Sequence, residues 1–196
     1  MLEIIFVRHG ESEMNRNNMY CGWTNSSLTE KGLRQAERVS EKLADEAIDL
    51  IISSDLDRCF KTAAIINRLH RKTIIKETAL RELNFGAWEG LTYHEICRDF
   101  PQEIKKWQED FINFKIPEGE SLLKMHKRVN KAFGRIINEH KEGKILIVSH
   151  SGVIRSILTQ QLLGSIDGYW KFKIKNCGIT RMEIMDNFLV LVGMNQ

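Results

Sequence analysis

The sequence predicts an α/β fold, a three-layer sandwich in which helices cover both faces of a mostly parallel central sheet, with a small helical lid insertion. Two observations lead to this prediction. Short apolar runs alternate along the chain with helical patterns, and the central runs are apolar throughout, which is typical of strands buried on both faces. The 196 residues show no internal repeat or linker, so residues 1–196 are expected to form a single domain.

The elements follow from the spacing of the apolar residues. The run Leu2–Val7 predicts the first strand, and the pattern that starts at Thr29 predicts the first long helix, running to about residue 47. The later elements, in order, are a strand over 48–52, a helix over 56–70, a strand over 73–75, helices over 120–140 and 153–163 on either side of a strand over 145–148, and strands over 172–175, 179–184 and 188–192. The C-terminal strands are expected to add an antiparallel edge.

The segment 85–117 interrupts this alternation, and we interpret it as a lid insertion over one edge of the sheet. It is rich in aromatic residues, and Ile104, Trp107, Phe111 and Phe114 follow helical steps of three and four. Such a stripe packs a lid helix onto the domain. It would also favour a substrate whose leaving group has an apolar or aromatic part.

Composition and charge exclude several classes of protein. The net charge of +3 is too small to predict nucleic-acid binding, and no apolar run is long enough to cross a bilayer. The four cysteines form no closely spaced pair, which favours free thiols in a reducing cytoplasm over a zinc or redox motif. We therefore expect a cytoplasmic protein with no nucleic-acid or membrane partner, and the sequence leaves a homodimer open.

Reactive residues follow three predicted strands, at the edge where α/β sheets bind ligands. Arg8 and His9 follow the first strand, Arg58 comes shortly after the second, and His150 follows the strand over 145–148. Two guanidinium groups match phosphate oxygens, and nearby cations lower the pKa of a histidine, which leaves a neutral, nucleophilic imidazole. The second histidine, if protonated, would add a donor. Phosphoryl transfer needs mainly this positioning and charge stabilisation, and the aspartates form no convincing metal site.

These motifs resemble the histidine phosphatase superfamily, which includes phosphoglycerate mutases, fructose-bisphosphatase domains and α-ribazole phosphatases. The resemblance covers most of the chain in ordered blocks: 8–12 with Asn15, Gly22 with 28–32, 53–63, 80–86, 117–121 and 148–153. It implies that His9 is the phosphorylated nucleophile and that Glu82 protonates the leaving oxygen and then activates water. It further implies that the phosphoryl oxygens are held by Arg8, Arg58 and His150, that the substrate pocket is lined by Asn15, Cys21, Gly22 and Ser151, and that neither a metal nor a cofactor is needed.

The resemblance implies a phosphomonoesterase that acts on a small phosphorylated metabolite. Phosphoglycerate mutases usually have a basic and aromatic run after the acid residue, but here Glu82 is followed by Leu83-Asn84-Phe85, which favours a phosphatase over a cofactor-dependent mutase. The third alternative is a degenerate module that only binds a phosphorylated ligand, but both His9 and Glu82 are present. Residues 169–174 resemble α-ribazole phosphatases, so α-ribazole 5′-phosphate ranks first among substrates, ahead of 3-phosphoglycerate and sugar phosphates.

Three smaller expectations concern residues outside the main motifs. Asn25 stands where the family usually has an acidic residue, which is expected to change how the loop 15–27 is anchored. Asp55 is expected to cap the helix that follows it. The remaining histidines are expected on solvated faces: His70, His94, His126 and His140.

Overall fold

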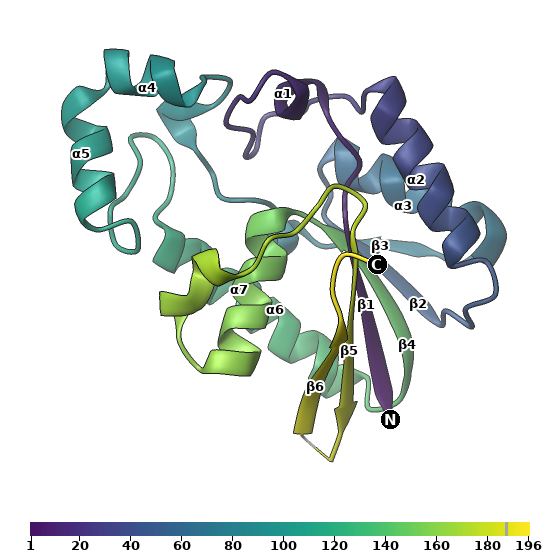
Figure 1. The fold of residues 1–196 in the computed structure, drawn as a ribbon. Coiled ribbons are helices and arrows are strands. Elements are labelled where there is room, and N and C mark those ends of the chain that lie inside the picture. The colour runs from purple at the N-terminus through teal and green to yellow at the C-terminus, as the bar shows by residue number, and fades with distance from the viewer. Residues whose placement is uncertain (187) are drawn as a thin grey trace.

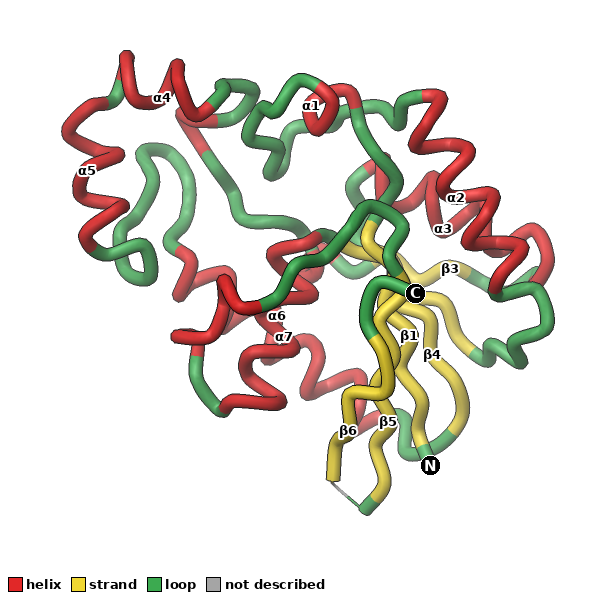
Figure 2. The backbone as a smooth tube through the Cα atoms, viewed as in Figure 1, coloured by secondary structure: helices red, strands yellow, loops and turns green. Residues whose placement is uncertain are grey.

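The computed structural model describes residues 1–186 and 188–196, and its sheet has the strand order β3-β2-β4-β1-β5-β6 (Figure 2). The strands β1, β4, β2 and β3 pair in parallel, whereas β5 pairs antiparallel with both β1 and β6. The predicted mostly parallel sheet with an antiparallel edge is therefore confirmed. The strands are β1 (Leu2–Arg8), β2 (Leu50–Ser53), β3 (Ile74–Lys76), β4 (Gly143–Ser149), β5 (Ile179–Met185) and β6 (Phe188–Gly193).

Helices cover both faces of this sheet, which confirms the three-layer sandwich (Figure 1). One face carries α2 (Glu30–Lys42) and α3 (Asp57–His70), and the other carries α6 (Leu122–Glu139) and α7 (Ser151–Leu163). None of the helices in the described residues has both the length and the apolarity needed to cross a membrane. The shorter elements are α1 (Glu13–Arg16), α4 (Tyr93–Asp99), α5 (Pro101–Glu109) and the 3₁₀ turns η1 (Thr78–Leu80), η2 (Gly86–Trp88) and η3 (Ile166–Lys171).

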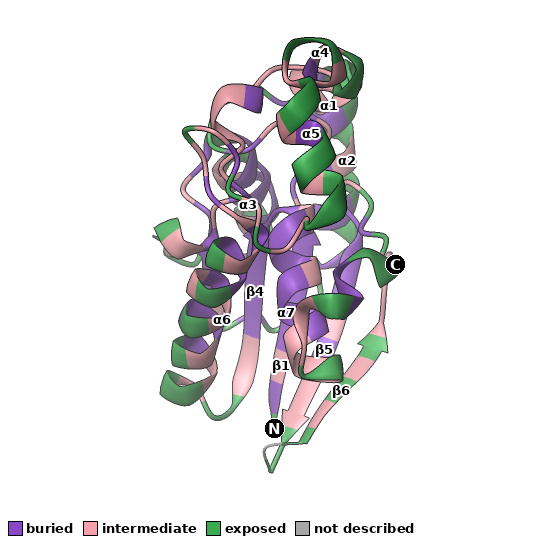
Figure 3. Cartoon of the chain, turned by 90° about the vertical axis from the view of Figure 1, so that its left-hand side faces the viewer, coloured by how far each residue is buried: buried purple, intermediate pink, exposed green. Residues whose placement is uncertain are grey.

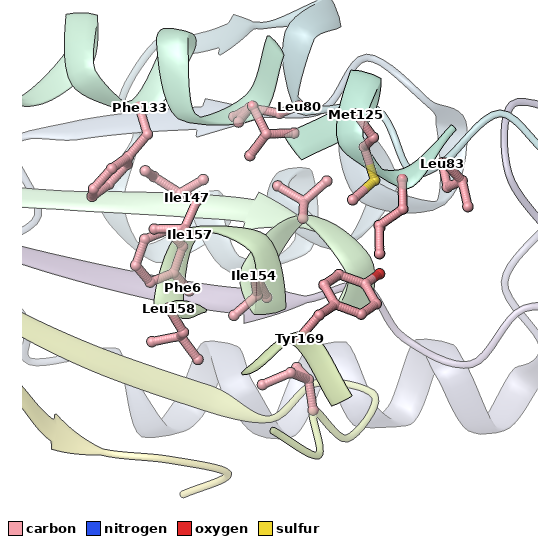
Figure 4. Packing of buried hydrophobic residues seen from close by; sticks show 14 of the residues in the cluster. Phe6, Leu80, Leu83, Met125, Phe133, Ile147, Ile154, Ile157, Leu158 and Tyr169 are labelled. Carbon is pink, nitrogen blue, oxygen red and sulfur yellow. The ribbon is translucent and has the colours of Figure 1, made fainter. Parts of the chain in front are cut away.

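The central strands are apolar throughout because successive side chains point to opposite, equally covered faces. Phe6 packs with the α6 and α7 side chains, whereas Ile5 and Val7 pack with those of α2 and α3. The rings of Phe6 and Phe133 lie 5.8 Å apart, and Figure 4 shows them in one cluster with Ile147 of β4 and Ile157 of α7. Figure 3 shows the resulting buried band through the middle of the molecule.

The parallel register brings the reactive motifs to one end of the sheet. Arg8 pairs with Ser149, and Ser53 pairs with Val148, so three strands end at nearly the same level. The residues that follow these strands therefore leave the sheet side by side. The loops at this end gather above the strands in Figure 2.

The segment 85–117 lies beyond the carboxyl ends of the strands, on the side of α6 and α7, and not over a sheet edge as expected (Figure 1). Its buried side chains belong to the same core cluster as those of α6 and α7, because Trp88 packs between Trp107 and Phe114 at centroid distances of 6.3 and 6.1 Å. Much of the aromatic stripe therefore serves packing.

Two expected elements differ from the structure. The first long helix ends at Lys42, and Leu43 closes it as a buried C-cap residue. The strand expected over 172–175 is wrong, because the sheet offers no partner there. Instead the carbonyl of Ile174 accepts from Arg8 Nη1, and the amide of Lys175 donates to the Asn195 side chain.

Two predicted side-chain environments are also wrong. Asp55 does not cap α3 but pairs with Arg81, and the amide of Asp57 donates instead to Asn25 Oδ1 at 3.1 Å. Asn25 thus anchors its loop to the start of α3. His126 is buried rather than solvated, because it lies one helical turn after Leu122 on the side of α6 that meets α7, where Ser156 lies 2.9 Å from its Nδ1.

Candidate active site

His9 is buried and held in one tautomer. Its Nδ1 lies 2.7 Å from the carbonyl oxygen of Gly10, which can only accept, so Nδ1 carries the proton. Nε2 therefore carries the lone pair, and Arg58 Nε donates to it across 3.3 Å. Burial, together with the neighbouring Arg58 and Arg8, lowers the pKa of His9 well below 6.5, in the direction that the flanking cations predicted. The ring is a neutral imidazole with its nucleophilic nitrogen beside a cation.

Arg58 lies almost wholly buried behind His9, in the first turn of α3. Its Nη1 donates to the carbonyl of Thr24 at 3.1 Å, and its Nη2 donates to that of Gly22 at 2.6 Å. A guanidinium that touches the nucleophilic nitrogen also reaches any phosphoryl group bonded there, where its fork matches two oxygens.

The loop that carries these carbonyls is held from its other side by Glu89. This carboxylate accepts from the amides of Gly22 and Trp23 at 2.9 and 2.7 Å and from that of Phe85 at 3.2 Å. The loop therefore turns its N–H groups to Glu89 and its carbonyls to Arg58. The position of Arg58 depends on an acidic residue that the sequence motifs did not single out.

His150 lies at the start of α7 with no exposed surface, and its ring centroid is 5.2 Å from that of His9. Its Nδ1 is 3.2 Å from Arg58 Nη2 and its Nε2 is 2.9 Å from Ser54 Oγ, so Nδ1 accepts and Nε2 carries the proton. Burial and the charge of Arg58 lower the pKa of His150 well below 6.5. The ring is therefore neutral, with its N–H bonded to Ser54 Oγ, and is not the protonated ring considered from the sequence.

Glu82 reaches the same site from the segment between η1 and η2. Its Oε2 accepts from the amide of Gly152 at 3.0 Å, in the first turn of α7. A Cβ atom on Gly152 would lie 2.1 Å from Glu82 Oε1. Only glycine at position 152 allows the carboxylate to come this close to the helix.

A cavity of about 380 Å³ lies in front of His9 and is polar for the most part. Arg8 lies on its wall, and Arg8 Nε is buried without a hydrogen-bond partner among the described residues, which leaves a donor for an anion. Arg58 and His150 lie behind His9, and Gly22 lies beside the cavity, none of them on its wall. The wall is formed by Arg8, His9, Asn15, Asn18, Met19, Tyr20, Cys21, Glu82, Phe85, Ser151 and Asn176.

Asn176 is a polar wall residue that the sequence did not single out, and it contacts the backbone of His9. Its Nδ2 donates to the carbonyl of His9 at 3.0 Å and to Asn15 Oδ1 at 3.2 Å. No motif surrounds it, because it lies in a loop that reaches the site only through the fold. Within the described residues, no group of three His, Cys, Asp or Glu side chains is placed to hold a metal ion.

The two buried neutral histidines predict that stability depends on pH. Their pKa values are lowered from 6.5 in the folded chain, so below that pH the unfolded chain binds more protons. The free energy of unfolding should therefore fall as the pH decreases through about 6.5 towards 5. Urea unfolding across this range measures the effect. His9→Ala removes one of the two groups and should flatten the curve, whereas an unchanged slope would contradict the assignment.

Comparison with known proteins supports the phosphoryl-transfer chemistry that the geometry of the site suggests. Phosphoserine phosphatase 1 of Hydrogenobacter thermophilus is 28% identical over 195 residues, covering 100% of this chain and 92% of that protein. Phosphoglycerate mutase-like protein 4 of Arabidopsis thaliana is 38% identical over 158 residues, covering 79% and 69%. The crystal structure of the α-ribazole phosphatase of Shigella flexneri superimposes with a TM-score of 0.94 at 26% identity, covering 99% of this chain and 96% of that one.

A family model spans nearly the whole chain. Residues 4–196 match the model of the histidine phosphatase superfamily (branch 1). The chain belongs to the histidine phosphatase superfamily, branch 1, and is a phosphatase of that superfamily.

Proposed function

We propose that this phosphatase hydrolyses monoesters of small phosphorylated metabolites through a phosphohistidine at His9. The observation that carries the proposal is the fixed tautomer of His9, with its Nε2 lone pair beside Arg58 and its Nδ1 proton on the Gly10 carbonyl. That carbonyl also stabilises the positive charge that the ring gains when Nε2 bonds to phosphorus. Both the nucleophile and the acid are in place, which favours an enzyme over a module that only binds its ligand.

The reaction proceeds in two displacements. Nε2 of His9 attacks phosphorus, the ester P–O bond breaks, and the leaving oxygen takes a proton from the Glu82 carboxyl. Glu82, now a carboxylate, then removes a proton from a water molecule. The resulting hydroxide attacks the phosphohistidine, the P–N bond breaks, and neutral His9 and inorganic phosphate are released. Arg8 and Arg58 stabilise the phosphoryl oxygens in both transition states, and His150, whose Nδ1 accepts from Arg58 Nη2, holds that guanidinium in place.

For the substrate we infer a leaving group with an apolar ring, and α-ribazole 5′-phosphate ranks first. A second, apolar cavity of about 70 Å³ adjoins the His9 cavity and shares Tyr20 and Phe85 with it. Its other wall residues are Leu83 and residues of α5 and its following loop, the start of α6 and η3, and they include Trp107, Phe111 and Trp170. The segment 85–117 thus supplies part of an apolar wall on which the edge of an aromatic base could pack, which supports its role as a lid.

Substrates with a carboxylate fit this site less well. Among the residues described around the His9 cavity, Arg8 is the one cationic side chain on the wall, and it is assigned to the phosphoryl group. A carboxylate on the leaving side would lose its hydration without gaining a cationic partner. This ranks 3-phosphoglycerate and phosphoserine below α-ribazole phosphate and also argues against the mutase alternative. The four free cysteines support a reducing compartment, and we infer the cytoplasm.

A substrate panel tests this ranking. We expect the highest kcat/KM for α-ribazole 5′-phosphate, ahead of phosphoserine, 3-phosphoglycerate and a sugar phosphate. Trp170→Ala should lower kcat/KM for α-ribazole phosphate by about 3- to 10-fold, the range expected for one lost aromatic contact, and leave the sugar phosphate unchanged. Tyr93→Ala, an exposed aromatic of α4 outside the apolar cavity, is the matched control.

Other results would change the assignment in different ways. If a carboxylate-bearing substrate is hydrolysed at least tenfold better than α-ribazole phosphate, the ranking is wrong and the phosphatase mechanism stands. If the enzyme interconverts phosphoglycerates when primed with a bisphosphate, the mutase alternative is correct.

A further inference from the structure

Glu82 lies in a stretch of chain that no regular element holds. Residues 81–85 run between η1 and η2 and belong to neither a helix nor a strand. The side chain of Glu82 is nevertheless buried and aimed at the amide of Gly152. Something other than a backbone ladder must therefore fix this segment, since a catalytic carboxyl has to be placed within a fraction of an ångström.

A single guanidinium from α6 supplies that restraint. Arg128 Nη1 donates to the carbonyls of Ala79 and Arg81 at 2.9 and 2.7 Å, and its Nη2 donates to the carbonyl of Glu82 at 2.7 Å. Without Arg128, the carbonyls of Ala79 and Arg81 would lose the side-chain donor that holds them. The Arg128 side chain is only 20% exposed, so these bonds are largely shielded from water.

A buried carboxylate completes the arrangement. Glu120 accepts from Arg128 Nη2 at 2.6 Å and from Arg128 Nε at 3.2 Å, which orients the guanidinium. The same carboxylate accepts from the amide of Asn84 at 3.0 Å. The segment is thus held on both sides of Glu82, by Arg128 before it and by Glu120 after it. On its solvent side, Trp23 Nε1 donates to the Glu82 carbonyl at 2.9 Å.

We propose that Arg128 and Glu120 are positioning residues for the acid–base step, and that they act through Glu82 by fixing its backbone. The proposal rests on the proposed role of Glu82 as the group that protonates the leaving oxygen. Arg128 and Glu120 bond to each other and to the backbone of residues 79–84, and neither lies on the wall of the His9 cavity. Their loss should therefore affect leaving groups that need a proton and spare those that do not.

The experiment measures kcat/KM of Arg128→Met on a series of aryl phosphates of increasing leaving-group pKa and on an alkyl phosphate. We expect activity on the alkyl phosphate to fall about 10- to 100-fold more than activity on the most activated aryl phosphate, within the range by which a positioned acid matters. Lys131→Met is the matched control, because Lys131 is an exposed cationic residue of the same helix and lies outside the wall of the His9 cavity. Glu120→Gln should give a smaller effect in the same direction.

A double variant separates positioning from a general loss of structure. In Glu82→Gln the acid is already missing, so adding Arg128→Met should cost little more on the alkyl phosphate. If Arg128→Met does not fold, Arg128→Lys and Glu120→Gln answer the same question. Equal losses on aryl and alkyl phosphates, or losses that multiply in the double variant, would overturn the proposal. If Glu82→Gln itself shows no dependence on the leaving group, the proposed role of Glu82 fails first, and this inference fails with it.

Discussion

Replacing His9 with alanine is expected to lower kcat/KM for every phosphate monoester by about 10⁴-fold or more, since a covalent catalyst loses its whole pathway with its nucleophile. The cavity keeps Arg8, Glu82 and Asn176, so the variant should still bind inorganic phosphate. The loss should appear equally with activated and unactivated leaving groups, because both need the same attacking nitrogen.

The matched control is His94→Ala. His94 is an exposed histidine of α4, outside the wall of the His9 cavity, and its replacement should leave activity unchanged. Steady-state kinetics and phosphate binding by calorimetry would be measured on both variants. A His9→Ala variant that keeps more than about a hundredth of the activity would show that another group attacks phosphorus.

Glu82→Gln is expected to have the second-largest effect, and it should be selective. An alkoxide is a poor leaving group, so removing the proton donor should slow alkyl phosphates by about 10²- to 10⁴-fold. An activated aryl phosphate needs little protonation and should be slowed much less. The amide keeps nearly the volume of the carboxyl, and its oxygen can still accept from the Gly152 amide, whereas the Leu83 amide loses its acceptor Glu82 Oε1.

Glu118→Gln serves as the control for this variant, because Glu118 is an exposed glutamate of the nearby loop. It should behave like the wild type on both substrates. The comparison requires kcat/KM on an alkyl and an aryl phosphate for each protein. Equal losses on the two substrates would argue that Glu82 shapes the site without transferring a proton.

The fold could be predicted because burial on both faces leaves a clear pattern. Runs such as Ile4–Val7 are apolar throughout, and Leu122, Met125, Val129 and Phe133 repeat at helical spacing. The segment 172–175 alternates apolar and charged residues, which is typical of a strand, but it forms none. Strand formation also depends on a free neighbouring sheet edge, which the sequence does not show. The burial of His126 could not be predicted, because the contact of α6 with α7 is set by packing between distant parts of the chain.

The residues of the site also divide into those that the sequence predicts and those that only the structure shows. His9, Arg58 and His150 follow strands within recognisable motifs, and the structure brings these three together behind one cavity. Asn176 and Arg128 could not be found from the sequence, because each acts through hydrogen bonds to residues more than 40 positions away. Asparagine and arginine are common residues, so neither stands out in the sequence. Only the fold shows that Asn176 contacts His9 and that Arg128 holds the segment 81–85.

The central claim is that the phosphoryl group passes through His9, and trapping the intermediate tests it most directly. The enzyme would be mixed with a ³²P-labelled monoester, quenched in base within milliseconds, and digested to locate the label. We predict a phosphoenzyme that is stable in base and labile in acid, with phosphate on Nε2 of His9, formed at least as fast as the steady-state turnover. A wild-type enzyme that turns over with no such species, or with phosphate on any other residue, would contradict the account.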